Sequence, residues 1–372
     1  MKGRLEAVNK ITVLIIEDSP FMRKLITELL QEDEQIEVVG IARNGAEGLL
    51  KIDKLKPDVV SLDIEMPVMD GIITLRKIME QKSIPVVMLS GTNRSGVDLV
   101  IECMKLGAVN FIEKPSGAFS QDLHRIKQEM IQKIKEAAKV NMSVFKRNIS
   151  SMNVSLLNDY SEECNLNKDF IGKESFHSSQ KIVCIGTSTG GPRALYTVLP
   201  LLSGVFFAPI LIVQLMPEGF TKSLAERLNE ISKIRVKEAE NGEILNKGTA
   251  YIAPGGYHLE ALYQSGELIA KVHKTTPVNG HCPSVDVLFK SICQLPEKYE
   301  CVAVIMTGMG SDGTNGILNL KKYKRVKLFA ESEETCVVFG MPKSAIETGI
   351  IDEIIPLHNI AGALNEICKV RG

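Results

Sequence analysis

Ser188 stands in the segment GTSTGG at residues 186–191, directly after an apolar run at residues 182–185. A strand that runs into a glycine-rich turn with a serine at its centre matches the G-x-S-x-G pattern, in which the corner exposes a nucleophilic hydroxyl. The same kind of turn can also hold a phosphate group on its backbone N–H groups. The sequence therefore predicts either a catalytic nucleophile or an anion-binding loop at Ser188.

A hydrolytic serine needs an imidazole that accepts its proton and a carboxylate that orients the imidazole. Asp312 is a candidate for the carboxylate, because it lies in the segment TGMGSDG at residues 307–313, which also follows an apolar run. Turns that follow parallel strands lie at one edge of the sheet, so we expect Ser188 and Asp312 at the same edge. The N–H groups of the serine turn could then stabilise an oxyanion. The alternative for Asp312 is a helix N-cap.

A second group of polar residues lies in the first third of the chain. Glu17 and Asp18 follow one apolar run, and Asp63 follows another. The carboxyl ends of parallel strands meet at one edge of a sheet, so these three carboxylates should converge. They would repel one another unless a hard divalent cation lay among them, and Mg²⁺ suits a site made only of oxygen ligands. The sequence therefore predicts a magnesium site formed by these three residues.

Asp63 is also placed to attack a phosphoryl group as a carboxylate nucleophile. Ser90 ends the fourth apolar run and Lys114 ends the fifth, so both should lie at the same edge as Asp63. A hydroxyl and an ammonium group there would hold the phosphoryl oxygens by hydrogen bonds. Each residue alone is commonly a cap or a surface group, but their arrival at successive strand ends favours a phosphoryl-transfer site.

Expected strands and helices alternate along the part of the chain that must position this acidic site. The first helix is expected to begin at Ser19-Pro20, a cap residue followed by proline at the first helical position. The last is expected at residues 122–139. Strands that alternate with helices predict a doubly wound parallel sheet, which places the domain at residues 10–130. The expected strands are residues 12–16, 37–42, 58–62, 86–90 and 110–113.

A second α/β domain is expected at residues 181–372, after a linker at residues 131–180 that becomes rich in Asn, Ser, Lys and Glu. An antiparallel hairpin is expected near residues 268–273. The predicted fold class is thus α/β, with two doubly wound parallel-sheet domains. The expected strands of the second domain are residues 182–185, 210–214, 249–252, 303–307, 327–330 and 353–356.

The composition excludes several other classes of protein. The 44 Lys and Arg residues nearly balance 45 Asp and Glu residues, giving a formal net charge of −1, which gives no support for a nucleic-acid or membrane-surface partner. No apolar run approaches the roughly 18 residues of a membrane span, and no amino-terminal signal is present, so we expect a soluble, cytoplasmic protein. The 8 cysteines lack C-x-x-C spacing, which favours reduced core thiols.

Residues 10–130 resemble a response-regulator receiver domain, which has a flavodoxin-like fold. The segments that carry the resemblance are IEDS at residues 16–19, LDIEMPVMDG at residues 62–71 and EKP at residues 113–115. The resemblance implies that a partner histidine kinase phosphorylates Asp63 and that Mg²⁺ is required. It also places Phe111 at the position of the family's switch aromatic, although a phenylalanine there could equally be a core residue.

Residues 181–368 resemble the catalytic domain of the chemotaxis protein-glutamate methylesterases, which has a Rossmann-like fold. That family hydrolyses methyl esters of receptor glutamates and deamidates receptor glutamines, and its unphosphorylated receiver domain restrains the active site. The resemblance implies Ser188 and Asp312 as catalytic residues, chemotaxis receptors as partners and no cofactor in this domain. The matching segments are GTSTGG at 186–191, MPEGFT at 216–221, YIAPG at 251–255, PVN at 277–279, PSVDVLF at 283–289, TGMG at 307–310 and VVFGMP at 337–342.

The chain departs from this family at residue 215. The resemblance places the catalytic histidine directly before Met216-Pro217, where this chain has Leu215. Leucine cannot accept a proton, and the amide of Gln214 does not titrate near neutral pH. Loss of one member of a catalytic triad lowers turnover by about 10⁴- to 10⁶-fold.

Other histidines offer weaker alternatives. His258 and His281 lie in family-like segments, although such residues are more often structural, and His358 gives a Ser–Asp–His order that we interpret as coincidence. Two functions therefore stay open: a phosphorylation-gated hydrolase of receptor glutamyl methyl esters, and a catalytically silent module that binds receptors. A single-base variant of a histidine codon would also account for Leu215. The matching segments favour the hydrolase.

Overall fold

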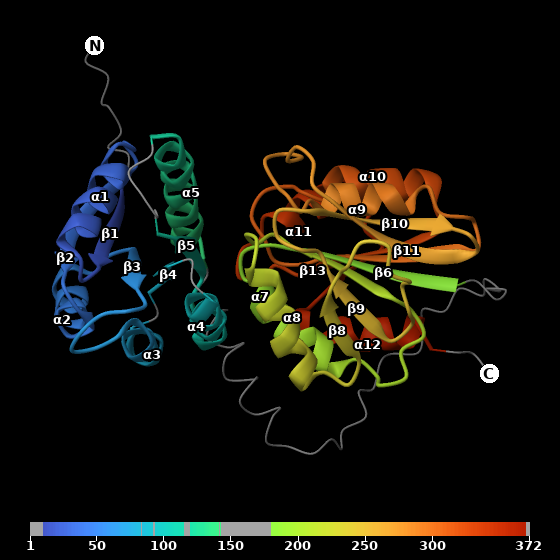
Figure 1. The fold of residues 1–372 in the computed structure, drawn as a ribbon, viewed down its shortest axis with the longest axis horizontal. Helices are drawn as coiled ribbons and strands as arrows, with labels where there is room; N and C mark the ends of the chain where they lie inside the picture. Colours follow the sequence, from blue (N-terminus) through green and yellow to red (C-terminus); the bar gives the residue numbers. More distant parts are fainter. Residues whose placement is uncertain are drawn as a thin grey trace, which may run out of the picture.

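The computed structural model describes residues 10–82, 84–91, 94–114, 120–140, 142 and 180–369. These residues form two α/β domains that lie side by side, with α4 and α5 of the first facing α7 and α8 of the second (Figure 1). Nowhere in the described part of the chain is there a helix with the length and apolarity of a membrane span. The cysteines of the described residues are all free, as expected, and Cys164 lies outside them.

The first domain is a five-stranded parallel sheet in the order β2-β1-β3-β4-β5. This is the flavodoxin-like order, so the predicted fold class is confirmed for this domain. Every residue of β3 and β4 is buried, because helices cover both faces of the sheet. The elements are β1 (Ile11–Ile16), α1 (Pro20–Gln31), β2 (Ile36–Ala42), α2 (Gly45–Leu55), β3 (Val59–Asp63), α3 (Gly71–Gln81), β4 (Val86–Ser90), α4 (Arg94–Leu106), β5 (Asn110–Glu113) and α5 (Ser120–Ala138).

Local sequence fixes the connections beside the acidic site. The predicted start of α1 is confirmed, since the Ser19 hydroxyl accepts a hydrogen bond from the Met22 backbone N–H at 3.4 Å. The connection from β3 to α3 passes so close to Asp63 that a Cβ atom on Gly71 would lie 2.1 Å from the Asp63 carbonyl oxygen. Only glycine fits there, so this residue determines how tightly the loop closes over the end of β3.

The second domain contains a seven-stranded parallel sheet in the order β14-β13-β12-β6-β7-β9-β8. A separate antiparallel pair is formed by β10 and β11, which confirms the expected hairpin. The elements are β6 (Gln180–Thr187), α7 (Gly191–Val198), η1 (Leu199–Leu201), β7 (Ile210–Gln214), α8 (Phe220–Ile231), β8 (Arg235–Glu238), β9 (Thr249–Ile252), β10 (His258–Gln264), β11 (Glu267–His273), α9 (Val285–Ile292), β12 (Tyr299–Ile305), α10 (Thr314–Tyr323), β13 (Val326–Glu331), α11 (Met341–Glu347), β14 (Glu353–Ile355) and α12 (Leu357–Ile367).

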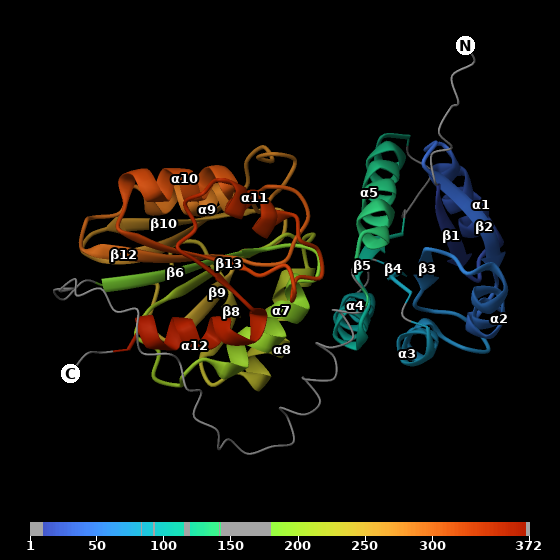
Figure 2. The same ribbon diagram turned by 180° about the vertical axis from the view of Figure 1, so that it is seen from behind.

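Helices cover both faces of this sheet. In Figures 1 and 2, α9, α10 and α11 lie on one face, and α7, α8 and α12 lie on the other. The chain leaves β6 for β7 on one side and later returns to place β12 on the other side of β6. This reversal makes the carboxyl ends of β6 and β12 a topological switch point, where ligands bind in open α/β sheets.

The structure differs from the predicted elements at two boundaries and in one additional strand. The strand expected at residues 303–307 is β12, which begins at Tyr299 and ends at Ile305, so Thr307 lies in the following turn. The short strand β8 was missed, because its sequence RVKE has only one apolar residue. Helix α5 continues to Ala138, past the domain end expected at residue 130, and most of the expected linker lies outside the described residues.

Candidate functional site

The structure brings the residues of the acidic site together. Lys114 Nζ lies 2.7 Å from Asp63 Oδ1 and 3.0 Å from Glu17 Oε2, and both carboxylates are buried. The three residues come from the ends of β1, β3 and β5, whose order in the sheet makes their carboxyl ends converge. The sequence therefore predicted correctly that these side chains meet.

The donor atoms present fit a hard divalent cation. Glu17, Asp18 and Asp63 each present a carboxylate oxygen, and these oxygens lie within 4.8 Å of one another. Asp63 Oδ2 is buried and forms no hydrogen bond with the described residues, so an acceptor is left for a cation or a phosphoryl group. Oxygen ligands of this kind are those that Mg²⁺ prefers.

The raised pKa values of Glu17 and Asp63 also indicate a site that a divalent cation would stabilise. Burial raises the pKa of the Asp63 carboxyl, and Lys114 opposes that rise. Burial also raises the pKa of Glu17, and the neighbouring charge of Asp63 raises it further. Both acids would ionise more readily beside a divalent cation, which favours the charged carboxylates.

Two other expected residues of this site lie nearby with different contacts. Ser90 is buried at the end of β4, where its hydroxyl donates to the Gly91 carbonyl oxygen at 3.0 Å, so it faces the backbone and not Asp63. Phe111 is buried in β5, and its ring packs against the ring of Phe220 on α8 with centroids 4.4 Å apart. The aromatic residue therefore lies in the contact between the two domains.

The serine turn is held on both sides by the neighbouring strands. The Ser188 N–H donates to the carbonyl oxygen of Thr307, after β12, at 3.0 Å. The Ser188 carbonyl oxygen accepts from the Gly191 N–H at 2.8 Å and from Gln214 Nε2, at the end of β7, at 3.0 Å. The turn needs glycine at residue 190, where φ is +81° and a Cβ atom would lie 2.5 Å from Val337 Cβ. The half-buried Ser188 is thus fixed at the switch point of the sheet.

Asp312 lies at the same edge of the sheet, but its contacts are those of a helix cap. Its Oδ2 atom accepts from the Val285 N–H at 2.7 Å, and Oδ1 accepts from the Ser284 hydroxyl at 2.9 Å and the Asp286 N–H at 3.2 Å. These groups form the start of α9, so Asp312 satisfies the free N–H groups of that helix. Asp312 is not itself an N-cap residue, because Ser284 precedes α9 and Gly313 precedes α10. A catalytic role for Asp312 stays a prediction.

No base occupies the expected histidine position. Leu215 is half-buried, packs against the apolar core on the α9 face and donates its backbone N–H to the Thr187 carbonyl oxygen at 3.1 Å. Of the other histidines, His258 is buried with Nε2 3.3 Å from the Thr276 carbonyl oxygen, and His358 is exposed on α12. The His281 backbone closes a two-residue turn with Val278. None of these three side chains has a hydrogen bond to Ser188 among the described contacts.

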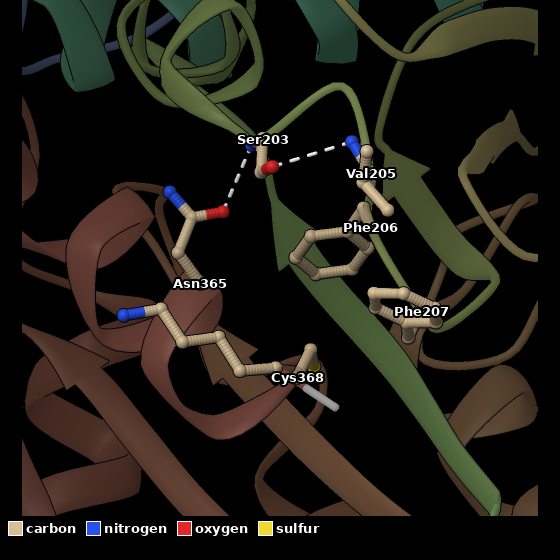
Figure 3. A pocket seen from close by; sticks show the side chains of 7 residues that line it. Ser203, Val205, Phe206, Phe207, Asn365 and Cys368 are labelled. Carbon is tan, nitrogen blue, oxygen red and sulfur yellow. Dashed lines mark hydrogen bonds between the residues drawn. The ribbon is translucent and has the colours of Figure 1, made fainter. Parts of the chain in front are cut away.

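The described part of the chain also has a pocket that lies away from both predicted sites. Figure 3 shows it between the segment before β7 and the end of α12, with Ser203, Phe206 and Asn365 among its lining residues. The Ser203 N–H donates to Asn365 Oδ1 at 2.9 Å across it. It lies at the amino-terminal edge of the sheet and contains no residue of either predicted site.

Sequence reasoning missed several polar residues that surround the serine turn. Thr307 and Gln214 contact Ser188 directly, Glu331 contacts Thr307, and Glu136 of α5 contacts Thr189. The sequence could have indicated Gln214, because it directly precedes the position where the methylesterase family has its catalytic histidine. No signal existed for Glu136, because its contact crosses between the domains.

The fold and the two sites define a response regulator whose second domain is a doubly wound α/β domain with a serine turn at its switch point. The chain matches the family Response regulator receiver domain over residues 13–126 and the family CheB methylesterase over residues 183–364. It is 48% identical over 360 residues to a protein-glutamate methylesterase/protein-glutamine glutaminase of Geobacillus kaustophilus, covering 96% of this chain and 98% of the relative. The chain belongs to this methylesterase/glutaminase family.

A second relative agrees with this membership, and a solved structure is also similar in sequence to part of the chain. A protein of the same name from Bacillus subtilis is 46% identical over 366 residues, covering 96% of this chain and 99% of the relative. Among solved structures, the CheB methylesterase catalytic domain of Thermotoga maritima is 47% identical, with a TM-score of 0.49, and covers 51% of this chain and 99% of that chain.

Proposed function

We propose that this chain is a phosphorylation-gated hydrolase that removes methyl groups from glutamyl methyl esters of chemotaxis receptors and deamidates receptor glutamines. The observation that carries the proposal is its identity of 48% over nearly the whole length of a protein with this named activity. The serine turn at the switch point supports it, because a strand-to-turn corner is the usual place for a hydrolytic serine. Ser188 is the proposed nucleophile, and Asp312 is the proposed carboxylate of the same site.

The proposed gate is the receiver domain, residues 10–130, together with the end of α5, which continues that domain to Ala138. The rest of the segment 131–180 separates it from the catalytic domain at 181–372. Asp63 is the proposed phosphorylation site, with a histidine kinase of the chemotaxis system as donor. Glu17, Asp18 and Asp63 would hold Mg²⁺, which when bound offsets the negative charge of the phosphoryl group. Lys114 and the Ser90 hydroxyl would hold phosphoryl oxygens, and Ser90 must turn away from the backbone to do so.

The contacts between the domains support gating of this kind. The Thr189 hydroxyl, beside Ser188, donates to Glu136 Oε2 of the receiver domain at 3.0 Å. Ser223 on α8 donates to Asp98 Oδ1 on α4 at 2.6 Å. These contacts keep the receiver domain against the serine turn, so access requires their release. The proposed location is the cytoplasm, where a kinase and the signalling ends of receptors would meet the chain.

Leu215 limits the proposed turnover. A serine hydroxyl without a general base is a weak nucleophile, so the rate should fall well below that of a complete triad. The second candidate function, a receptor-binding module without turnover, is favoured by one specific observation: the oxygens of Asp312 are engaged by the start of α9.

The decisive measurement is methanol release from methylated receptor by the full chain, by Leu215→His and by Ser188→Ala. Release by the full chain that Ser188→Ala abolishes would exclude the silent module. Release only after Leu215→His would establish that residue 215 limits the reaction, and it would exclude takeover by another histidine. If neither the unaltered chain nor Leu215→His released methanol, the hydrolase proposal would be refuted.

A further inference from the structure

Thr307 holds the serine turn through two of its polar groups. Its carbonyl oxygen accepts from the Ser188 N–H at 3.0 Å and from the Thr187 hydroxyl at 2.8 Å. Its own hydroxyl donates to the Thr189 carbonyl oxygen at 3.0 Å. Three consecutive residues of the turn therefore depend on one fully buried residue of the neighbouring connection.

Glu331 in turn holds Thr307. The ladder between β12 and β13 ends at the pair Ile305 and Ala330, so no strand partner is left for the Thr307 N–H. Glu331 is the last residue of β13, and its Oε2 atom accepts that N–H at 2.8 Å. Its Oε1 atom accepts from the Thr335 hydroxyl at 3.0 Å. Both oxygens of this fully buried carboxyl are thus used to fix backbone and hydroxyl groups below the serine turn.

A carboxyl in this place is unfavourable for stability alone. Burial raises the pKa of Glu331 to about 7, although the hydrogen bonds from Thr307, Thr335 and Cys336 oppose the rise. An apolar side chain would avoid this desolvation but would leave the Thr307 N–H without an acceptor. The role of the buried carboxyl is therefore to orient Thr307 by accepting its backbone N–H.

We propose that Glu331 and Thr307 are positioning residues for Ser188, which fix the serine turn against the connection that follows β12. The hydrogen bonds of Thr307 reach the backbone of the turn and the Thr187 hydroxyl. Glu331 holds Thr307, so both residues act through the segment that carries Ser188. Misplacement of a nucleophile lowers the rate of the chemical step more than it weakens binding, so kcat should fall while KM stays constant. The kinetic part rests on the proposed hydrolase function, and the structural part rests only on the hydrogen bonds.

The kinetic test uses the full chain with Leu215→His, phosphorylated by a small phosphodonor, and measures methanol release from receptor membranes. Glu331→Leu removes the acceptor and Thr307→Val removes the hydroxyl, and each should lower kcat about tenfold or more with KM within about twofold. Glu331→Gln keeps an acceptor oxygen and should retain kcat within about threefold. Unchanged kcat in folded Glu331→Leu, or an equal loss in Glu331→Gln, would overturn the proposal.

Glu300→Leu is the matched control for burial. Glu300 is also a buried glutamate of this sheet, but it lies at the opposite end of β12 and pairs with Arg325 at 3.3 Å. This variant should lose stability without loss of kcat. A loss of kcat as large as that of Glu331→Leu would assign the effect to general destabilisation and overturn positioning.

A second readout does not require activity. Hydrogen exchange at the Ser188 amide reports its bond to Thr307, so Glu331→Leu should accelerate exchange at residues 187–191 about tenfold or more, and Glu331→Gln should not. Unchanged exchange in Glu331→Leu would overturn the proposal. If Leu215→His releases no methanol but exchange responds as expected, the proposed function fails and the positioning contact stands.

Discussion

The hydroxyl of Thr189, next to Ser188, donates a hydrogen bond of 3.0 Å to Glu136 Oε2 on α5 of the receiver domain. Glu136 is buried and also accepts from Asn110 Nδ2 at 3.3 Å and Gln132 Nε2 at 3.0 Å. A carboxylate held by two residues of its own domain thus reaches the residue beside the proposed nucleophile. The two domains are therefore linked at the serine turn itself.

Glu136→Ala should loosen this closed arrangement. A hydrogen bond to a carboxylate contributes about 1.5–3 kcal/mol, so methanol release by the unphosphorylated chain in the Leu215→His background should rise roughly tenfold. Glu129→Ala is the control, because Glu129 lies on the same helix and pairs with Lys133 within the receiver domain. An unchanged unphosphorylated rate in Glu136→Ala, or an equal rise in Glu129→Ala, would contradict a role for the contact in gating.

Asp63→Asn should abolish acyl-phosphate formation, and chelation of Mg²⁺ should abolish it in the unaltered chain. Phosphoryl labelling that persists in Asp63→Asn would show that Asp63 is not the phosphoryl acceptor.

The same variant should also change the stability of the native state. Burial raises the native-state pKa of Asp63 above its usual value, so its contribution to stability is present at low pH and is lost as the pH rises through the native pKa.

At pH 7.5 without metal, Asp63→Asn should therefore raise the melting temperature of the receiver domain. Addition of Mg²⁺ should stabilise the unaltered chain more than the variant, because the cation binds the native carboxylates. Calorimetry of the full chain with and without Mg²⁺ measures both effects. A lower melting temperature for the metal-free variant would show that the ion pair with Lys114 outweighs the burial of Asp63.

Glu331 predicts a pH dependence in the second domain. Its pKa rises from 4.5 to about 7 on folding because of burial, so the stability of the native state falls as the pH rises from about 4.5 through 7. Glu331→Gln lacks this titration, and its free energy of unfolding should gain ~3 kcal/mol relative to the unaltered chain between pH 4.5 and 8. Urea unfolding at several pH values gives this difference, and a constant difference would contradict the raised pKa.

Gly190→Ala should disrupt the serine turn. The residue has φ of +81°, and the new Cβ atom would lie 2.5 Å from Val337 Cβ, so the backbone must move. Left-handed backbone at a non-glycine residue costs about 1–2 kcal/mol before the clash is added. Gly219→Ala is a suitable control, since it has φ of +89° but no atom within 4 Å of the new Cβ. Equal losses of stability in both variants would show that the contact with Val337 adds nothing.

The sequence was sufficient to bring Glu17, Asp63 and Lys114 together, because topology alone makes the ends of their strands meet. Glu17 and Asp63 each follow a strong apolar run and Lys114 follows a shorter one, and a parallel sheet that pairs those strands brings the three side chains to one edge. The sequence also placed Ser188 and Asp312 at one edge of one sheet. It could not decide between a cap and a catalytic role for Asp312, because both use the same turn.

The remaining contacts depend on features that a linear pattern does not contain. Glu331 follows the strand expected at residues 327–330 and precedes four polar residues, so it resembles a surface residue, and charged side chains are seldom fully buried. Its burial results from the neighbouring connections. The contact of Glu136 with Thr189 depends on how two separately folded units meet, which the periodicity of neither unit specifies.

Phe111 belongs to a strand that ends at the acidic site, and it also contacts the second domain. It lies in β5, three residues before Lys114, which holds Asp63, and its ring also packs on Phe220 of α8. A shift of this strand after phosphorylation of Asp63 would move the ring that packs between the two domains. The residue that holds Asp63 and a residue that contacts the second domain are thus only three positions apart, so the phosphorylation site and the contact between the domains share one short segment.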